Sequence, residues 1–248
     1  MPVFASLLAA SGALRVASLN LCTDEYLLLL AHPGEIASVS RLSHDPADSP
    51  LWRKGRRALA NLGTLESALP SRPTLLLTMG GGGKASAMIA ERLRMKTLDL
   101  PFPANLEDVE ANMTRVAAAL GDPGRAASWR RKLRRLRATL PRPRDAIYLS
   151  AGGISVGANS LGAQWMLLAG FAQRPLPGGR ATLETLTLHP PAILLRANYR
   201  RAQPSLGQRW LAHPLAHHAA RTVDTDGRAW TCAGPSLVEE ITRLRGVG

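Results

Sequence analysis

An internal repeat constrains this 248-residue chain more than any other feature of its sequence. Residues 64–77 and 182–195 both begin with Thr-Leu-Glu, place a proline seven residues after the glutamate, and then continue into an apolar run. The two copies start 118 positions apart, which is nearly half of the chain. A chance match is the alternative, but self-similarity at a fixed offset is typical of a structural unit that occurs twice. The repeat therefore predicts two pseudo-equivalent lobes.

The remaining sequence alternates short apolar runs with helix-like segments. In the first half we expect strands at 15–21, 36–40, 74–78 and 97–100, with helices at 23–31 and 85–93. In the second half we expect strands at 147–150, 192–195 and 221–224, with helices at 161–169, 208–216 and 235–244. Strands that alternate with helices imply parallel pairing, so the fold class is α/β, with a parallel sheet in each Rossmann-like lobe.

A helix-only stretch separates the two halves. Asn105 can cap a helix that runs to Leu120, and Asp122-Pro123 can restart it after a break at 121–124. Both pieces together, residues 105–140, would cover ~50 Å at 1.5 Å per residue, enough to bridge two lobes. We therefore predict an N-terminal lobe at 14–104, a long connecting helix at 105–140, a C-terminal lobe at 141–248, and a ligand cleft between the lobes.

The first 13 residues are apolar and then small, and they have no basic start. Ser11 and Ala13 suit the −3 and −1 positions of signal-peptide cleavage, so residues 1–13 are interpreted as the remnant of a signal peptide whose true start lies upstream. The alternative is a ragged apolar N-terminus. No apolar stretch reaches ~18 residues, so no segment is expected to span a bilayer.

The net charge of +13 has two explanations. Only four of the 31 basic residues are Lys, a skew typical of a GC-rich genome. The densest run, residues 129–137, has leucines at helical spacing with arginines opposite, which indicates an amphipathic helix with a solvated face. The alternative is a nucleic-acid or protein-interaction surface, but aromatic residues are only 4% of the chain, so stacking platforms are scarce. We expect no nucleic acid as a partner.

The repeat, the alternation and the connector together resemble the periplasmic substrate-binding proteins of ABC importers for iron–siderophore complexes, heme and cobalamin. The resemblance extends from Leu14 onward. Its most specific segments are 62–77 in the first half and 181–195 in the second, with Leu167-Leu-Ala-Gly170 resembling the leucine-rich helix end before a ligand loop. It implies that Glu66 and Glu184 dock the two lobes onto the permease in the inner membrane. The alternative is that both glutamates only favour the dipole of a helix start.

In open α/β lobes a ligand lies beyond the carboxyl ends of the strands. Those positions supply the candidate ligand-binding residues, which are Cys22, Thr23, Arg41, His44, Met79, Gly80, Gly81, Arg180, Arg196, Tyr199, Trp230 and Cys232. Arg41, Arg180, Arg196 and also Arg200 can offer forked donors to an anionic chelate. The run from Gly80 to Lys84 is not a phosphate-binding loop, because Ala85 follows the lysine where Ser or Thr is needed. It is interpreted as a rim loop of the cleft.

The two cysteines map to strand-to-helix junctions in opposite lobes, so we expect Cys22 and Cys232 to approach one another across the cleft. Three interpretations stay open: a disulfide that ties the lobes together, paired thiolates that bind a metal or metal complex, and two unrelated buried thiols.

Nothing in the sequence resembles a Ser-His-Asp set, a paired carboxylate site or a metal-spaced histidine cluster, so we expect a binding protein rather than an enzyme. The hypothesis is a monomeric periplasmic protein that delivers an iron chelate or a related metal complex to an ABC permease. A cobalamin- or heme-binding member of the same class is the alternative. The metal complex would be cargo, with no intrinsic cofactor.

Overall fold

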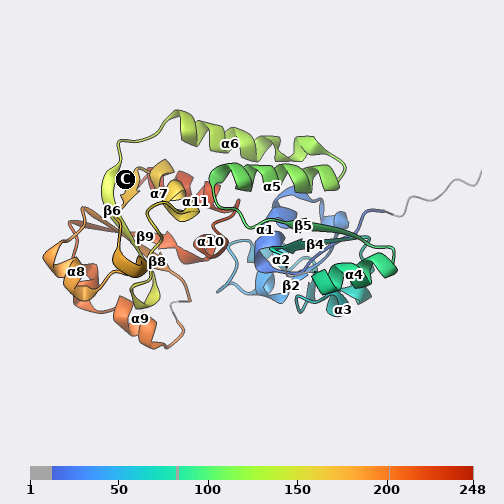
Figure 1. The fold of residues 1–248 in the computed structure, drawn as a ribbon, viewed down its shortest axis with the longest axis horizontal. Helices are drawn as coiled ribbons and strands as arrows, with labels where there is room; N and C mark the ends of the chain where they lie inside the picture. Colours follow the sequence, from blue (N-terminus) through green and yellow to red (C-terminus); the bar gives the residue numbers. More distant parts are fainter. Residues whose placement is uncertain (1–12, 82–83, 201, 248) are drawn as a thin grey trace, which may run out of the picture.

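The computed structural model describes residues 13–81, 84–200 and 202–247, and within them the chain forms two α/β lobes joined by helices (Figure 1). Each lobe has its own sheet, and every pair of neighbouring strands in both sheets is parallel. The two-lobed α/β prediction is therefore confirmed. The predicted signal-peptide remnant lies outside the described residues except for Ala13. Each helix in the described ranges is too short or too polar to cross a membrane.

The N-lobe contains a five-stranded sheet in the order β3-β2-β1-β4-β5. Its strands are β1 (Val16–Ser18), β2 (Ile36–Ser40), β3 (Leu59–Asn61), β4 (Leu75–Met79) and β5 (Lys96–Leu100). Its helices are α1 (Leu21–Leu30), α2 (Trp52–Gly55), α3 (Leu65–Ala68) and α4 (Lys84–Arg92), with 3-10 turns η1 (Pro33–Glu35), η2 (Arg41–His44) and η3 (Leu69–Ser71). The interior strand β4 is buried along its whole length, as expected for a parallel strand covered on both faces.

The C-lobe contains a four-stranded sheet in the order β7-β6-β8-β9. Its strands are β6 (Arg144–Leu149), β7 (Phe171–Gln173), β8 (Ile193–Asn198) and β9 (Arg221–Asp226). Its helices are α7 (Leu161–Leu168), α8 (Leu183–Leu188), α9 (Leu206–Leu211), α10 (Gly227–Cys232) and α11 (Leu237–Arg245), with 3-10 turns η5 (Ala151–Gly153), η6 (Pro177–Gly179) and η7 (Pro214–His217). In Figure 1 this lobe lies on the left, and the two lobes meet where α10 approaches α1 and α2.

The connector is built from α5 (Leu106–Ala119), the 3-10 turn η4 (Pro123–Ala126) and α6 (Ala127–Ala138). The side chain of Asn105 accepts a hydrogen bond from the backbone N–H of Asp108 and caps α5, as predicted. The predicted break is also present, since the side chain of Asp122 accepts from the N–H of Gly124. Figure 1 shows α5 and α6 side by side along the upper edge, so the chain turns back at the break and does not form one straight rod.

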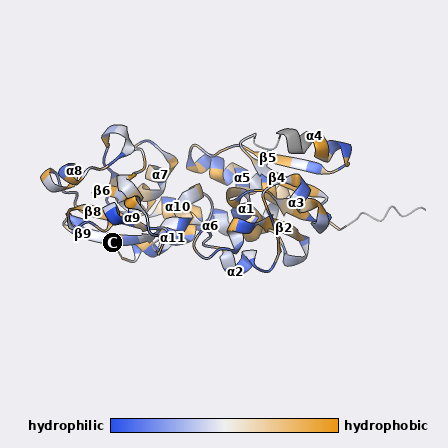
Figure 2. Ribbon diagram, turned by 90° about the horizontal axis from the view of Figure 1, so that it is seen from below, coloured by the Kyte–Doolittle hydropathy of each residue, from blue (hydrophilic) through white to orange (hydrophobic). Residues whose placement is uncertain are grey.

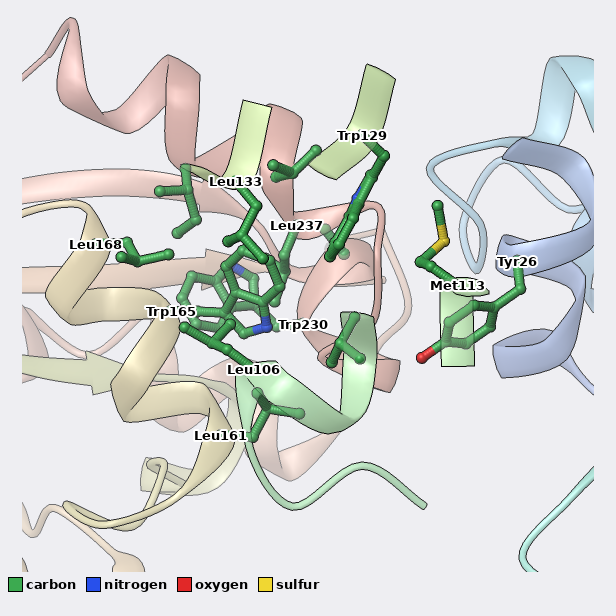
Figure 3. Close-up of a cluster of buried hydrophobic side chains, with 14 of the residues drawn as sticks. Tyr26, Leu106, Met113, Trp129, Leu133, Leu161, Trp165, Leu168, Trp230 and Leu237 are labelled. Carbon is green, nitrogen blue, oxygen red and sulfur yellow. The ribbon is translucent and has the colours of Figure 1, made fainter. Parts of the chain in front are cut away.

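One cluster of buried hydrophobic side chains runs from the N-lobe through the connector into the C-lobe. Tyr26 of α1 and Met113 of α5 lie at its N-lobe end, and Leu133 of α6 and Trp165 of α7 lie at its C-lobe end (Figure 3). Hydrophobic and hydrophilic residues alternate along the outer helices in Figure 2, as expected for helices that bury one face. Because the buried cluster is shared, the connector packs as part of both lobes.

The sequence predictions differ from this fold at several places. Strands β3 and β7 were not expected, since each has only three residues and cannot display a period. Helix α1 begins two residues earlier than predicted, because the side chain of Asn20 caps it by accepting from the N–H of Thr23. Residues 227–232 were expected to be a loop but form α10, whose N-cap is Asp226.

Candidate ligand-binding site

A cavity of about 830 Å³ lies between the lobes. The C-lobe wall is formed beyond the carboxyl ends of β8 and β9, with Asn198, Asp226 and Arg228 among its residues. The N-lobe contributes the loop that contains Asp45 and Ala47. This is where two facing α/β lobes are expected to hold a ligand, and the volume is within the range of small-molecule sites.

Beside this cavity, a carboxylate of the N-lobe holds a loop of the C-lobe. Asp48 is only 2% exposed, and its Oδ1 accepts from Tyr199 Oη at 2.9 Å. The guanidinium of Arg200 binds the same carboxylate through two hydrogen bonds, Nε to Oδ1 and Nη2 to Oδ2, both at 2.7 Å. Burial and the neighbouring Asp48 raise the pKa of Tyr199, so the phenol stays a donor. We call this group of three side chains the Asp48 clamp.

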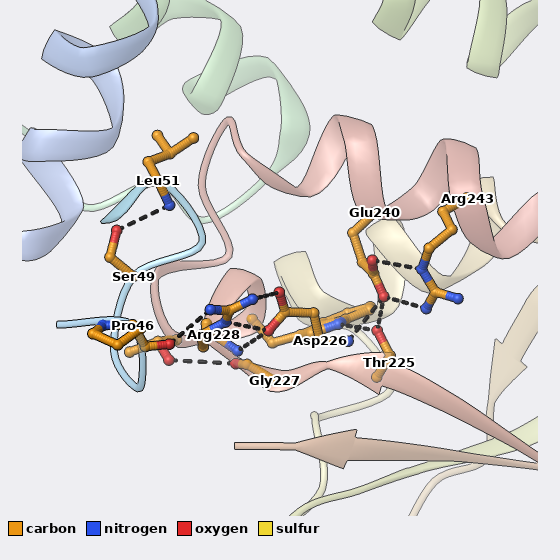
Figure 4. Close-up of polar contacts among 11 residues, drawn as sticks. Pro46, Ser49, Leu51, Thr225, Asp226, Gly227, Arg228, Glu240 and Arg243 are labelled. Atoms are coloured by element: carbon orange, nitrogen blue, oxygen red, sulfur yellow. Dashed lines mark hydrogen bonds and ion pairs between the residues drawn. The ribbon is translucent and has the colours of Figure 1, made fainter. Parts of the chain in front are cut away.

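A second polar link crosses between the lobes next to the clamp (Figure 4). Arg228 donates from Nη1 to the backbone oxygen of Pro46 at 2.7 Å. Asp226 orients that guanidinium by accepting from Nε at 2.8 Å and from Nη2 at 2.6 Å. Gly227 lets this helix start lie close to the β8 loop, because a Cβ there would be 2.6 Å from the Cβ of Tyr199.

Behind the wall of the cavity, a buried network holds β9 against α11. Glu240 accepts from Thr225 Oγ1 at 2.5 Å and from the N–H of Asp226 at 2.9 Å, and Arg243 also donates to it. Hydrogen bonds from these donors hold the pKa of Glu240 below its usual value, although burial opposes them. Trp230 completes the network by donating from Nε1 to Thr225 Oγ1 at 2.8 Å. The carboxyl end of β9 is therefore held to α10 and α11 by hydrogen bonds.

The two cysteines form a disulfide that ties the lobes together, with 5.3 Å between the Cα atoms of Cys22 and Cys232. Of the three interpretations left open by the sequence, the structure contains the first. The interpretation of both cysteines as thiolate metal ligands is wrong for this form, because a sulfur bonded to another sulfur is not a thiolate. Cys232 is also the last residue of α10 and not part of a loop that opens a helix.

Two consecutive carboxyl groups are buried next to this disulfide, in α1. Asp24 accepts from the hydroxyls of Ser40 at 2.6 Å and Ser43 at 2.7 Å, all within the N-lobe. Glu25 instead reaches the C-lobe and accepts from Ser236 Oγ at 2.7 Å, while its Oε1 has no hydrogen-bond partner among the described residues. Burial raises the pKa of both carboxyl groups to about 7, although the serine donors oppose the rise.

The structure brings few of the sequence-predicted ligand residues to the cavity. Arg200 lines the cavity. Tyr199 lies beside the cavity, where it donates to Asp48 in the Asp48 clamp. Arg41 and Arg180 are exposed and do not line the cavity. His44 and Arg196 do not line it either, and Arg196 forms an ion pair with Asp224. Their role as ligand contacts stays a prediction.

Five other predicted residues have structural surroundings of another kind. Thr23 is buried and donates to the backbone oxygen of Asn20 at 3.0 Å. Met79 is part of the core, and Trp230 is 8% exposed with its ring 4.9 Å from that of Tyr148. Gly80 and Gly81 follow β4, where the N–H of Gly81 donates to Asp99 Oδ2 at 2.9 Å. The cleft-facing position expected for Trp230 is therefore not what the structure shows, because its indole fills the C-lobe core.

Sequence reasoning missed Asp48, Asp226, Arg228 and Glu25 as parts of the lobe interface. The only local indication was the position of Asp226 at the carboxyl end of a strand. The partners of the other three lie in the opposite half of the chain, and no local pattern identifies them. Among the described residues, no group of three or more His, Cys, Asp and Glu side chains is arranged to hold a metal ion.

The repeated glutamates occupy equivalent positions in the two lobes. Glu66 is the second residue of α3, and Glu184 is the second residue of α8. Each helix is capped by the threonine two positions earlier, Thr64 accepting from the N–H of Ser67 at 3.3 Å and Thr182 from that of Thr185 at 3.0 Å. Both glutamates are exposed, and neither has an ion-pair partner in the described chain.

No protein-family model and no curated protein sequence matches the chain. Solved structures do match it. The periplasmic heme-binding protein HutB of Vibrio cholerae gives a TM-score of 0.71 at 15% identity, covering 95% of this chain and 98% of that one. A periplasmic heme-binding protein from Pseudomonas aeruginosa gives 0.66 at 20% identity, covering 94% and 91%. The periplasmic vitamin B12-binding protein BtuF of Vibrio cholerae gives 0.63 at 15% identity, covering 94% and 95%. The chain has the fold of these two-lobed binding proteins.

Proposed function

We propose that this protein is the substrate-binding component of an ABC importer and captures a metal complex in the cavity between its lobes. The observation that carries the proposal is the coincidence of that cavity with the carboxyl ends of β8 and β9, in a chain that shares its whole fold with periplasmic heme- and vitamin B12-binding proteins. The disulfide is consistent with a periplasmic location, because disulfides persist in oxidising compartments.

The lining of the cavity favours a polar chelate as cargo. Asp45, Asn198, Gln203 and Arg243 present carboxylate, amide and guanidinium groups to it. Such groups suit the carboxylate, hydroxamate or amide oxygens of an iron chelate. A heme or a corrinoid is the second candidate, since the proteins of the same fold include binders of both.

Binding is tested with the purified protein and four probes: ferric citrate, a ferric hydroxamate siderophore, hemin and cyanocobalamin. Titration calorimetry should show saturable binding of one of them. Ala47→Trp, which places an indole in the N-lobe wall of the cavity, should weaken that binding at least about tenfold, the effect of losing about 1.4 kcal/mol. The matched control is Ala138→Trp on the exposed end of α6. Equal affinity in both variants would show that the ligand does not occupy this cavity.

The proposed partner is the permease in the inner membrane, docked through Glu66 and Glu184. Two exposed carboxylates at equivalent places in the two lobes can orient an encounter while costing little desolvation. The double variant Glu66→Ala/Glu184→Ala should keep its ligand affinity and lose stimulation of the ATPase of the reconstituted importer. The control changes two other exposed acids, Glu91 and Glu239. Lost ligand affinity in a folded docking variant would instead place these glutamates in the ligand site.

A further inference from the structure

One face of α6 carries arginines that no acidic side chain neutralises. Arg130, Arg131, Arg134 and Arg135 have neither a hydrogen bond nor an ion pair from their side chains within the described chain. The flanking cations differ from them, because Lys132 pairs with Glu239 and Arg137 pairs with Glu107 and Glu110. We call the four unpaired residues the arginine face.

The packing of α6 fixes the direction of this face. Leu133 is fully buried, and Leu136 and Trp129 are nearly so. Trp129 also donates from Nε1 to the backbone oxygen of Pro235 at 2.8 Å. Because these side chains hold one side of the helix in the hydrophobic cluster, the arginines on the other side point to solvent. The face is therefore a built feature of the fold and not a frayed terminus.

The spacing of the arginines places like charges side by side. Arg130 and Arg134 are four residues apart, as are Arg131 and Arg135, and like charges at that spacing disfavour the helix. Three of these arginines also surround a hollow of about 260 Å³ together with Ala127 and Glu110. Glu110 already interacts with Arg137 at 3.4 Å, so the hollow carries an excess of positive charge. An anionic group placed there would relieve the repulsion.

We propose that the arginine face binds the phosphate groups of an anionic phospholipid surface. Guanidinium groups match phosphate oxygens in geometry, and basic clusters on amphipathic helices are attracted to anionic lipids. Helix α6 has 12 residues and lies along the outer edge of the molecule, so it can rest lengthwise on a flat surface (Figure 1). A nucleic acid fits the face less well, because the aromatic ring of this helix, Trp129, is only 7% exposed and cannot stack on a base.

This role goes beyond delivery of a ligand to the permease. In Figure 1 α6 runs along the upper edge, whereas α3 and α8, which carry the proposed docking glutamates, lie in the lower half. The arginine face is thus separate from the docking surface, and a protein bound to lipid through α6 keeps Glu66 and Glu184 accessible. Membrane retention and permease docking can therefore be tested independently.

The test is sedimentation of the full-length protein with vesicles of phosphatidylcholine that contain about a third phosphatidylglycerol, at low and at high salt. We expect binding to these vesicles at low salt, and no binding to pure phosphatidylcholine. The variant Arg130→Gln/Arg131→Gln/Arg134→Gln should bind about 100-fold more weakly, since each arginine near such a surface contributes roughly fivefold. Circular dichroism confirms that the variant is folded.

A control with the same net charge separates the face from the overall charge. Arg57→Gln/Arg92→Gln/Arg94→Gln removes three exposed arginines of the N-lobe and should keep nearly full binding. An equal loss in both variants would overturn the proposal, because binding would then depend on net charge alone. Release by millimolar inorganic phosphate at constant ionic strength would overturn it in favour of a free-phosphate site. Binding to a DNA duplex without binding to vesicles would overturn it in favour of a nucleic acid.

Discussion

Replacing Glu25 with Gln should remove part of the pH dependence of stability. Burial raises the pKa of Glu25 from 4.5 to about 7, and the carboxyl group is 1% exposed. A folded state with a raised pKa holds its proton more tightly than the unfolded chain does. The contribution to stability is therefore fully present below pH 4.5 and is lost progressively as the pH rises towards 7.

The pKa difference sets the size of the effect. A shift from 4.5 to about 7 is equivalent to about 3 kcal/mol of unfolding free energy, lost at about 1.4 kcal/mol per pH unit. Asp24 has a similarly raised pKa and adds a second slope over the same interval. Gln has the shape of the protonated acid, and its carbonyl can accept from Ser236. Glu25→Gln should thus match the wild type at acidic pH and exceed its stability by about 3 kcal/mol at pH 8.

The assay is urea unfolding with the disulfide intact, followed by tryptophan fluorescence at several pH values between about 5 and 8. The unfolding free energy of the wild type should fall with pH at a slope that corresponds to the release of about two protons. For Glu25→Gln the slope should correspond to about one proton. The exposed Glu91→Gln is the control and should keep the wild-type slope. If Glu25→Gln also keeps that slope, the carboxyl group is ionised in the folded state and the reasoning from burial is refuted.

Three further changes test the lobe interface. Replacing Cys22 and Cys232 with Ser opens a loop of 210 residues, so the unfolded chain gains entropy and the unfolding free energy should fall by about 5 kcal/mol. Urea unfolding measures this change, and an unchanged midpoint would contradict it. Asp48→Asn should weaken the Asp48 clamp and increase the mean distance between fluorophores placed on the two lobes. The control Asp45→Asn should leave that distance unchanged, because Asp45 has no partner in the other lobe within the described chain. Leu133→Ala should cost about 3 kcal/mol by leaving a cavity where the connector meets the C-lobe, and a shift in melting temperature of less than a degree or so would show that the site collapses freely.

The sequence by itself determined the architecture of the two lobes. Apolar runs such as 36–40 and 74–78 became β2 and β4, because short buried strands and capped helices are encoded by neighbouring residues. The repeated Thr-Leu-Glu segments became α3 and α8, since a threonine cap works within one turn. Asn105 and Asp122 likewise marked the connector and its break through local hydrogen bonds.

Only the tertiary structure decided how the lobes are joined and what surrounds the cavity. Asp48 meets Arg200 across 152 positions, Glu25 meets Ser236 across 211, and the cysteines meet across 210. Each pairing depends on the angle at which two separately encoded lobes pack through the shared hydrophobic cluster, and a shift of a few ångströms would give each side chain a different partner. The choice between a disulfide and free thiols, and the burial of Trp230 in the C-lobe core, follow from that packing and from no local pattern.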